Sequence, residues 1–144
     1  MHKNRTILLV EDDAVDAMTV RRAFKDLRIN NHLHHAENGE VALAWLRDPK
    51  KELPCLILLD LNMPRMNGIE FLHEAKADEC LRKIPVVVLT TSEEEQDKTQ
   101  SFNLGVAGYM LKPVDYVQFI EVVRTIDMYW TLSKLASTEC IHDE

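Results

Sequence analysis

A short apolar run that stops at an acidic residue constrains the fold of this chain more than any other feature. Residues 56–59 read Leu-Ile-Leu-Leu, and Asp60 follows them directly. A continuous apolar run of this length is typical of a strand buried on both faces of a parallel sheet. Because burying an unpaired charge is costly, we expect Asp60 at the carboxyl end of that strand. Pro64 and the turn dipeptide Asn67-Gly68 indicate that the strand has ended by then.

The same alternation of an apolar run and an amphipathic segment repeats along the whole chain. Strand-like runs are expected at residues 6–10, 32–36, 56–60, 86–90 and 109–111. Apolar residues at helical spacing predict helices at about 14–27, 40–47, 68–79 and 115–130. A capping-box pattern that begins at Ser92, with Gly105 after the expected end, predicts a further helix at 92–104. Strand–helix alternation predicts a parallel sheet covered by helices on both faces. We therefore predict an α/β, flavodoxin-like, doubly wound fold of five parallel strands in the order 2-1-3-4-5.

Length and composition bound the remaining possibilities. The 144 residues suit one domain, expected over residues 1–130, with a C-terminal tail at 131–144 and no output domain. A net charge of −7 disfavours nucleic acid as a partner. The apolar runs are too short to span a membrane, and no signal-peptide segment follows the start. The three cysteines, at positions 55, 80 and 140, are interpreted as reduced thiols of a cytoplasmic protein.

Polar side chains are expected to converge where the parallel strands end. They are Glu11 and Asp12 after the first strand, Asp60 after the third, Thr90 after the fourth and Lys112 after the fifth. Three crowded carboxylates repel one another and so indicate a bound cation. Oxygen ligands without nearby histidine or cysteine favour Mg²⁺, which readily shares its ligands with a phosphoryl group. Asp60 alone would fit a loop cap equally well, but this set of residues predicts a phosphate site.

An aspartate at such a site can act as a nucleophile toward phosphorus and form an acyl phosphate. A lysine and a hydroxyl are the additional donors that a phosphoryl group needs. The sequence thus predicts phosphate transfer onto Asp60.

Several motifs together resemble the receiver domains of bacterial two-component response regulators, over about residues 5–130. They are Leu9-Val10-Glu11-Asp12, Leu58-Leu59-Asp60-Leu61-Asn62-Met63-Pro64, Gly68, Leu89-Thr90, Gly108-Tyr109 and Lys112-Pro113. The resemblance implies a stand-alone regulator that accepts a phosphoryl group from a sensor histidine kinase or a phosphotransfer protein. A less specific similarity is to the small stand-alone receivers paired with phytochromes.

The resemblance also assigns roles to individual residues. Asp60 is the implied phosphoacceptor, Asp12 a direct Mg²⁺ ligand, Glu11 an acid acting mainly through water, and Asn62 a ligand through its backbone carbonyl. Thr90 and Lys112 are expected to bind phosphoryl oxygens. Asp13 is interpreted as the start of the following loop and not as a ligand.

Further expectations concern the response to phosphate. Thr90 and Tyr109 are implied to move together as a switch, and the Lys112-Pro113 bond is implied to be cis. Asn62 and Ser92 are expected to set the lifetime of the acyl phosphate.

The last expectation concerns the surface that contacts a partner. A homodimer through the fourth helix, fifth strand and fifth helix is expected, with Tyr129 and Trp130 at its seam. The alternative is that these aromatic residues fold back onto their own domain.

A haloacid-dehalogenase-type phosphatase is the rival function, but it needs an aspartate where Asn62 stands. His34 and His35 are expected on opposite sides of a strand, which disfavours a metal site there.

Overall fold

The computed structural model describes residues 5–61, 68–90, 105–113 and 115–132, and of residues 129–132 it describes the backbone only. Five parallel strands form one sheet in the order β2-β1-β3-β4-β5, which confirms the predicted topology. The strands are β1 (Ile7–Val10), β2 (Leu33–Ala36), β3 (Leu56–Asp60), β4 (Val86–Thr90) and β5 (Gly108–Leu111).

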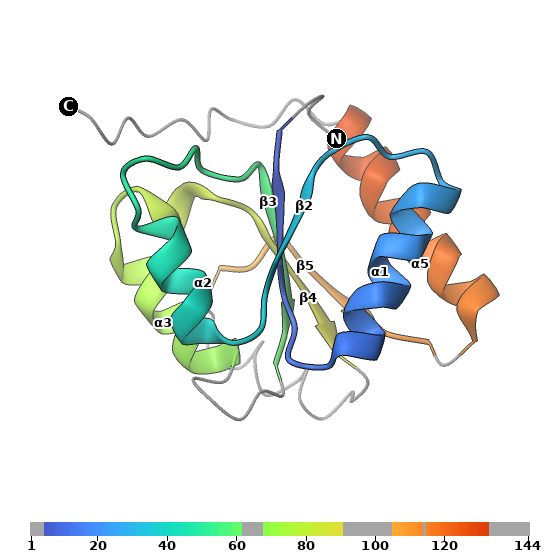
Figure 1. Cartoon of the computed structure of the whole chain (residues 1–144), viewed down its shortest axis with the longest axis horizontal. Helices are drawn as coiled ribbons and strands as arrows, with labels where there is room; N and C mark the ends of the chain where they lie inside the picture. Colours follow the sequence, from blue (N-terminus) through green and yellow to red (C-terminus); the bar gives the residue numbers. More distant parts are fainter. Residues whose placement is uncertain (1–4, 62–67, 91–104, 114, 133–144) are drawn as a thin grey trace.

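Helices cover both faces of this sheet (Figure 1). On one face lie α2 (Gly39–Leu46) and α3 (Gly68–Ala77), which is followed by the short 3-10 helix η1 (Leu81–Lys83). On the other face lie α1 (Ala14–Asp26) and α5 (Tyr116–Leu132). The helix expected at 92–104 lies outside the described residues. Helix α5 continues two residues beyond the expected domain limit at 130.

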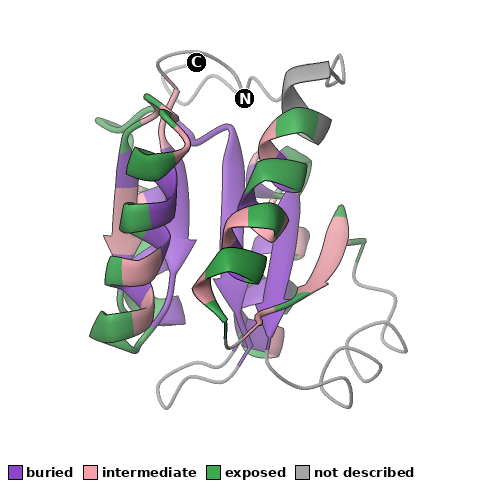
Figure 2. Cartoon of the chain, turned by 90° about the vertical axis from the view of Figure 1, so that its right-hand side faces the viewer, coloured by how far each residue is buried: buried purple, intermediate pink, exposed green. Residues whose placement is uncertain are grey.

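The sheet separates two apolar cores, because alternate side chains of each strand point to opposite faces. Leu8 and Val10 of β1 pack toward α2 and α3, whereas Ile7 and Leu9 pack toward α1 and α5. All residues of β1, β3 and β4 are buried (Figure 2). This double burial explains why these strands are continuous apolar runs in the sequence.

Two side-chain caps fix where helices begin. Asp13 caps α1, and its Oδ1 accepts hydrogen bonds from the backbone N–H groups of Val15 and Asp16 at 2.8 and 3.2 Å. Asn38 caps α2 in the same way, accepting from the Val41 N–H at 2.9 Å. Such caps satisfy backbone donors that have no partner within the helix.

Two findings concern membrane and thiol chemistry. Among the described residues, no helix combines the length and apolar character needed to cross a bilayer.

Cys55 is a buried thiol beside β3, but Cys80 is disulfide-bonded. The expectation of reduced thiols is therefore wrong for Cys80, because sequence spacing does not reveal which thiols a fold brings together.

Candidate functional site

The strand ends bring the predicted acidic residues together at the carboxyl edge of the sheet. Glu11 and Asp12 follow β1 and Asp60 ends β3, and one carboxylate oxygen from each lies within 4.8 Å of the others. In the part of the chain that the structure describes, this is the one such group of three or more potential metal ligands. Glu11 and Asp60 are 2% and 8% exposed, whereas Asp12 is exposed. The cluster therefore combines buried and solvent-facing oxygen ligands, as a site for a hard cation requires.

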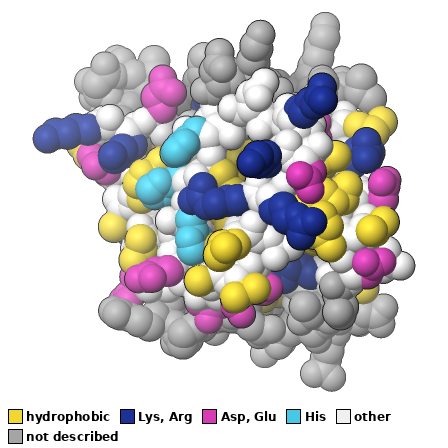
Figure 3. Space-filling model, turned by 45° about the vertical axis from the view of Figure 1, so that its right-hand side comes forward, with side chains coloured by type: hydrophobic (Ala, Val, Ile, Leu, Met, Phe, Trp, Pro, Cys, Tyr) yellow, Lys and Arg dark blue, Asp and Glu magenta, His cyan; other side chains and the backbone are white. Residues whose placement is uncertain are grey.

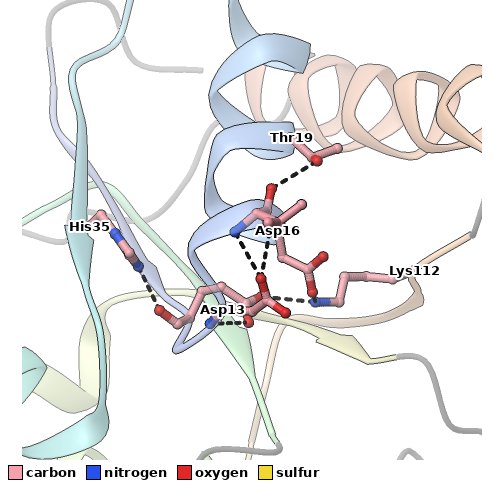
Figure 4. A network of polar contacts seen from close by, with 7 residues as sticks. Asp13, Asp16, Thr19, His35 and Lys112 are labelled. Atoms are coloured by element: carbon pink, nitrogen blue, oxygen red, sulfur yellow. Dashed lines mark hydrogen bonds and ion pairs between the residues drawn. The ribbon is translucent and has the colours of Figure 1, made fainter.

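Lys112 extends from the end of β5 into this acidic cluster (Figure 4). Its Nζ lies 2.8 Å from Glu11 Oε1 and 3.1 Å from Asp16 Oδ2. The Lys112 and Glu11 side chains are 10% and 3% exposed, so this contact is shielded from bulk water, whereas Asp16 is partly solvated. One ammonium thus joins β1, β5 and the first turn of α1 at the site.

Asp16 is the site residue that sequence reasoning missed. It lies in the first turn of α1, four residues after Asp12 in the sequence. That spacing was a usable signal.

The charges of Glu11 and Lys112 are strongly coupled. The pKa of Glu11 is raised to about 7, mainly by burial; the hydrogen bond and charge of Lys112 oppose this shift, and the neighbouring Asp60 adds to it. For Lys112, burial lowers the pKa, but the hydrogen bond and charge of Glu11 outweigh it, with help from Asp60 and Asp16, so the net pKa is raised. Lys112 therefore stays cationic, and its ammonium favours the ionised form of the buried Glu11 carboxylate.

Backbone contacts hold the Glu11 segment in place. The Asp13 N–H donates to Glu11 Oε2 at 3.3 Å, and the His35 ring contacts the Glu11 carbonyl through Nε2 (Figure 4). His34 instead stacks on Trp45 of α2, with ring centroids 4.4 Å apart. The two histidines face different neighbours, as expected for adjacent residues of a strand.

Gly68 positions the chain immediately after Asp60. Its N–H donates to the Leu61 carbonyl at 3.0 Å, so the end of β3 and the start of α3 are joined directly. A Cβ at residue 68 would lie 2.7 Å from Leu61 Cα and 2.8 Å from the Asp60 carbonyl oxygen. Only glycine fits this close approach between two backbone segments.

The two expected switch residues lie on the neighbouring strands. Thr90 is fully buried at the end of β4, and Tyr109 of β5 is half-buried against the core beside α2 and α3. Burial raises the pKa of Tyr109, which keeps the phenol neutral. The Lys112 N–H donates to the Thr90 carbonyl at 2.7 Å and so connects the switch threonine to the lysine.

One expectation for this segment is wrong. No peptide bond among the described residues is cis, so the Lys112-Pro113 bond is trans. The trans form is the intrinsically favoured isomer of an X-Pro bond, by about 0.5–1 kcal/mol.

Other expected site residues cannot be placed. Asn62 and Ser92 lie outside the described residues, as do the side chains of Tyr129 and Trp130.

Comparison with known proteins links this geometry to a family. Residues 7–124 match the response regulator receiver domain. The response regulator Rcp1 of Synechocystis sp. is 38% identical over 130 residues, which are 88% of this chain and 88% of Rcp1. The fold also resembles that of the phosphorylated cyanobacterial phytochrome response regulator RcpA, with a TM-score of 0.84, 35% identity, and 93% of this chain and 99% of RcpA covered. For the Mn²⁺-bound form of Rcp1, the TM-score is 0.82 at 36% identity, covering 92% and 99% of the two chains.

Proposed function

The chain belongs to the response regulator receiver family, and on this basis we propose that Asp60 accepts a phosphoryl group from a phosphohistidine of a sensor kinase or phosphotransfer protein. An Asp60 oxygen attacks phosphorus, the phosphorus–nitrogen bond of the donor breaks, and the leaving imidazole takes a proton from water. The observation that supports this most directly is the grouping of Glu11, Asp12 and Asp60 carboxylates beside Lys112.

Mg²⁺ is the proposed cofactor, held by Asp12, Asp60 and the Asn62 carbonyl, with Glu11 acting mainly through water. The oxygen-only ligand set fits a hard cation, and the relative Rcp1 is known in a Mn²⁺-bound form. The cation would neutralise charge on the phosphoryl oxygens. Thr90 and Lys112 supply the remaining donors, Thr90 through its hydroxyl and Lys112 through its ammonium.

The first prediction tests the phosphoacceptor. Wild-type protein incubated with acetyl phosphate and Mg²⁺ should gain one acid-labile phosphoryl group by intact-mass measurement, and chelation of the metal should prevent the gain. Asp60→Asn should gain none, because an amide cannot form the acyl phosphate. Persistence of the adduct in Asp60→Asn would contradict the assignment, and sustained turnover of a simple phosphoester by the wild type would favour the rival phosphatase function.

The second prediction concerns Asp16. Because Asp16 holds Lys112 at 3.1 Å, it competes with a phosphoryl group for the same ammonium. Asp16→Asn should therefore tighten the binding of beryllofluoride, a phosphoryl mimic, by about threefold at saturating Mg²⁺, a small effect because Asp16 is partly solvated. Amide NMR titration measures this affinity. Glu79→Gln, which removes the same charge at an exposed position, should leave it unchanged, and a weaker affinity in Asp16→Asn would show that Asp16 assists the phosphoryl group instead.

We further propose that phosphorylation is transmitted through Thr90 and Tyr109. A phosphoryl group adds negative charge and strong acceptor oxygens beside Thr90 and Lys112. Movement of the Thr90 hydroxyl toward them would leave space for Tyr109 and would shift the ensemble of β5 and α5 between two states. Asn62 and Ser92 are proposed to tune the lifetime of the adduct.

A homodimer is the proposed output contact. Leu111 of β5 and Val117 and Met128 of α5 are exposed by 38%, 69% and 54%. Val117 and Met128 are about three helical turns apart and therefore share one side of α5. This exposed apolar surface supports a seam through the fourth helix, β5 and α5 that continues to Tyr129 and Trp130, which sedimentation with and without beryllofluoride can detect.

The proposed setting is a cytoplasmic two-component pathway. Its upstream partner is a sensor histidine kinase, and the likeness to a phytochrome response regulator makes a photoreceptor kinase the first candidate to test.

A further inference from the structure

A basic groove lies at the end of α1 that is farthest from the phosphate site. It has a volume of about 630 Å³ and is formed by the last turns of α1, the following turn and the start of β2. Helix α1 begins beside the carboxyl edge of the sheet, so its last turns lie near the opposite edge. Figure 3 shows Lys and Arg side chains gathered beside histidines on the face that carries this region.

Three cations of the groove have no counter-ion within the described part of the chain. Arg21, Lys25 and Arg28 line it and are exposed, and among the described residues none of them forms an ion pair. Their neighbour Arg22 contrasts with them, because it pairs with Asp26 at 3.7 Å and lies over the Tyr116 ring at 4.0 Å. An uncompensated positive patch is notable in a chain of net charge −7.

Arg28 adopts a backbone conformation that is unfavourable for arginine. Its φ is +57°, in the left-handed region where glycine is the usual residue after a helix. The Arg28 N–H bonds the Lys25 carbonyl at 3.0 Å, and the Ile29 N–H bonds the Phe24 carbonyl at 2.9 Å. Glycine would close this helix end without strain, so the Arg28 side chain is placed at the groove at a cost in backbone strain.

Several basic side chains also surround the edge strand β2. The pKa of His34 in β2 is lowered, first by burial and then by the positive charges of His32, Lys51, His35 and Arg21. The region thus has the electrostatic character of an anion-binding surface.

The floor of the groove is apolar, which narrows the kind of anion it fits. Phe24 and Leu33 are 4% and 5% exposed, and Ile29 is half-buried beside them. Strand β2 forms the edge of the sheet, so an extended chain can approach along it. In an extended chain, alternate side chains point to opposite sides, so acidic residues can meet the cations while apolar residues meet the floor.

We propose that this groove docks an extended acidic segment of a partner protein. Charge complementarity supports this occupant, and the apolar floor favours a peptide over a uniformly charged polyanion. A nucleic acid or an anionic membrane would extend past the groove and meet the acidic remainder of the chain, whereas a short peptide contacts the groove alone. The groove is separate from the Asp60 site, so docking does not require phosphorylation.

A labelled synthetic peptide of alternating Glu and Leu tests the proposal by fluorescence anisotropy. The wild type should bind it, and added salt should weaken binding. Arg21→Gln/Lys25→Gln should weaken binding by about tenfold, whereas Lys50→Gln/Lys83→Gln, with the same change in net charge outside the groove, should change it less than about twofold. Arg28→Gly should also weaken binding while keeping or raising the melting temperature, because it removes the strained conformation.

Several outcomes would overturn the proposal. They are absence of peptide binding to the wild type, equal losses in the two double variants, and stronger binding to phosphatidylglycerol vesicles or duplex DNA than to the peptide. Self-association that disappears in Arg21→Gln/Lys25→Gln would assign the groove to a second copy of the chain instead.

Discussion

Substitution of Gly68 by alanine is expected to lower the free energy of unfolding by about 1–3 kcal/mol and to slow phosphorylation of Asp60. The added Cβ would lie 2.7 Å from Leu61 Cα and 2.8 Å from the Asp60 carbonyl oxygen. Both neighbours belong to the backbone, so no side-chain rotation relieves the contact. The end of β3 must therefore shift, and the Asp60 carboxylate shifts with it.

Chemical denaturation and the rate of adduct formation with acetyl phosphate measure the two effects. Gly108→Ala is the matched control, because its Cβ would meet only Val87 Cγ2, at the ordinary contact distance of 3.8 Å. That variant should stay within about 0.5 kcal/mol of the wild type. Equal behaviour of the two variants would contradict the steric role assigned to Gly68.

Substitution of Lys112 by methionine is expected to destabilise the metal-free protein by about 3 kcal/mol at pH 8. Lys112 lies 2.8 Å from Glu11, and the two side chains are 10% and 3% exposed. Removal of the ammonium leaves Glu11 buried beside Asp60 without its cation. The same change should abolish the response of Thr90 and Tyr109 amide signals to beryllofluoride, because the phosphoryl mimic loses its lysine partner.

The destabilisation caused by Lys112→Met should depend on pH with a defined sign. The pKa of Glu11 is already raised to about 7, so the folded wild type holds a proton there below neutral pH and loses it as the pH rises. Without Lys112, which lowers this pKa, the folded state must either keep the proton or bury an unpaired carboxylate. The difference in unfolding free energy should therefore be small near pH 5.5 and grow through pH 7 to 8.

Urea denaturation across this range, in the presence of a chelator, measures the difference. Lys83→Met serves as the control at an exposed position and should show no such trend. A destabilisation by Lys112→Met that is constant with pH would show that the lysine acts through packing alone.

The sequence predicted the sheet well because its strands are buried on both faces. Runs such as residues 56–59 contain only apolar residues, and one acidic residue marks where burial ends. Strand order followed from alternation of strands and helices together with the resemblance to receiver domains. Half-buried β5 was also located, although its apolar signal is shorter.

The sequence could not reveal features that depend on contacts between distant segments. Asp16 was missed because its role arises from Lys112, which is 96 residues away in the chain. The close contact of Gly68 with the backbone of Asp60 and Leu61 was likewise visible in the sequence only as a turn signal. The left-handed backbone conformation at residue 28 was not visible, because the residue there is arginine and not the glycine that usually marks it. The disulfide-bonded state of Cys80 and the trans bond before Pro113 differ from expectation for the same reason, since neither is encoded in local pattern.

The most direct test of the account is to locate the phosphoryl group on the chain. Borohydride reduces an aspartyl phosphate to homoserine, which peptide mass mapping can assign to a single position. After reaction with acetyl phosphate and Mg²⁺, we predict homoserine at residue 60 alone, and none when the metal is chelated. Homoserine at residue 12, or a stable phosphoryl group on any other residue with residue 60 unchanged, would contradict the central claim.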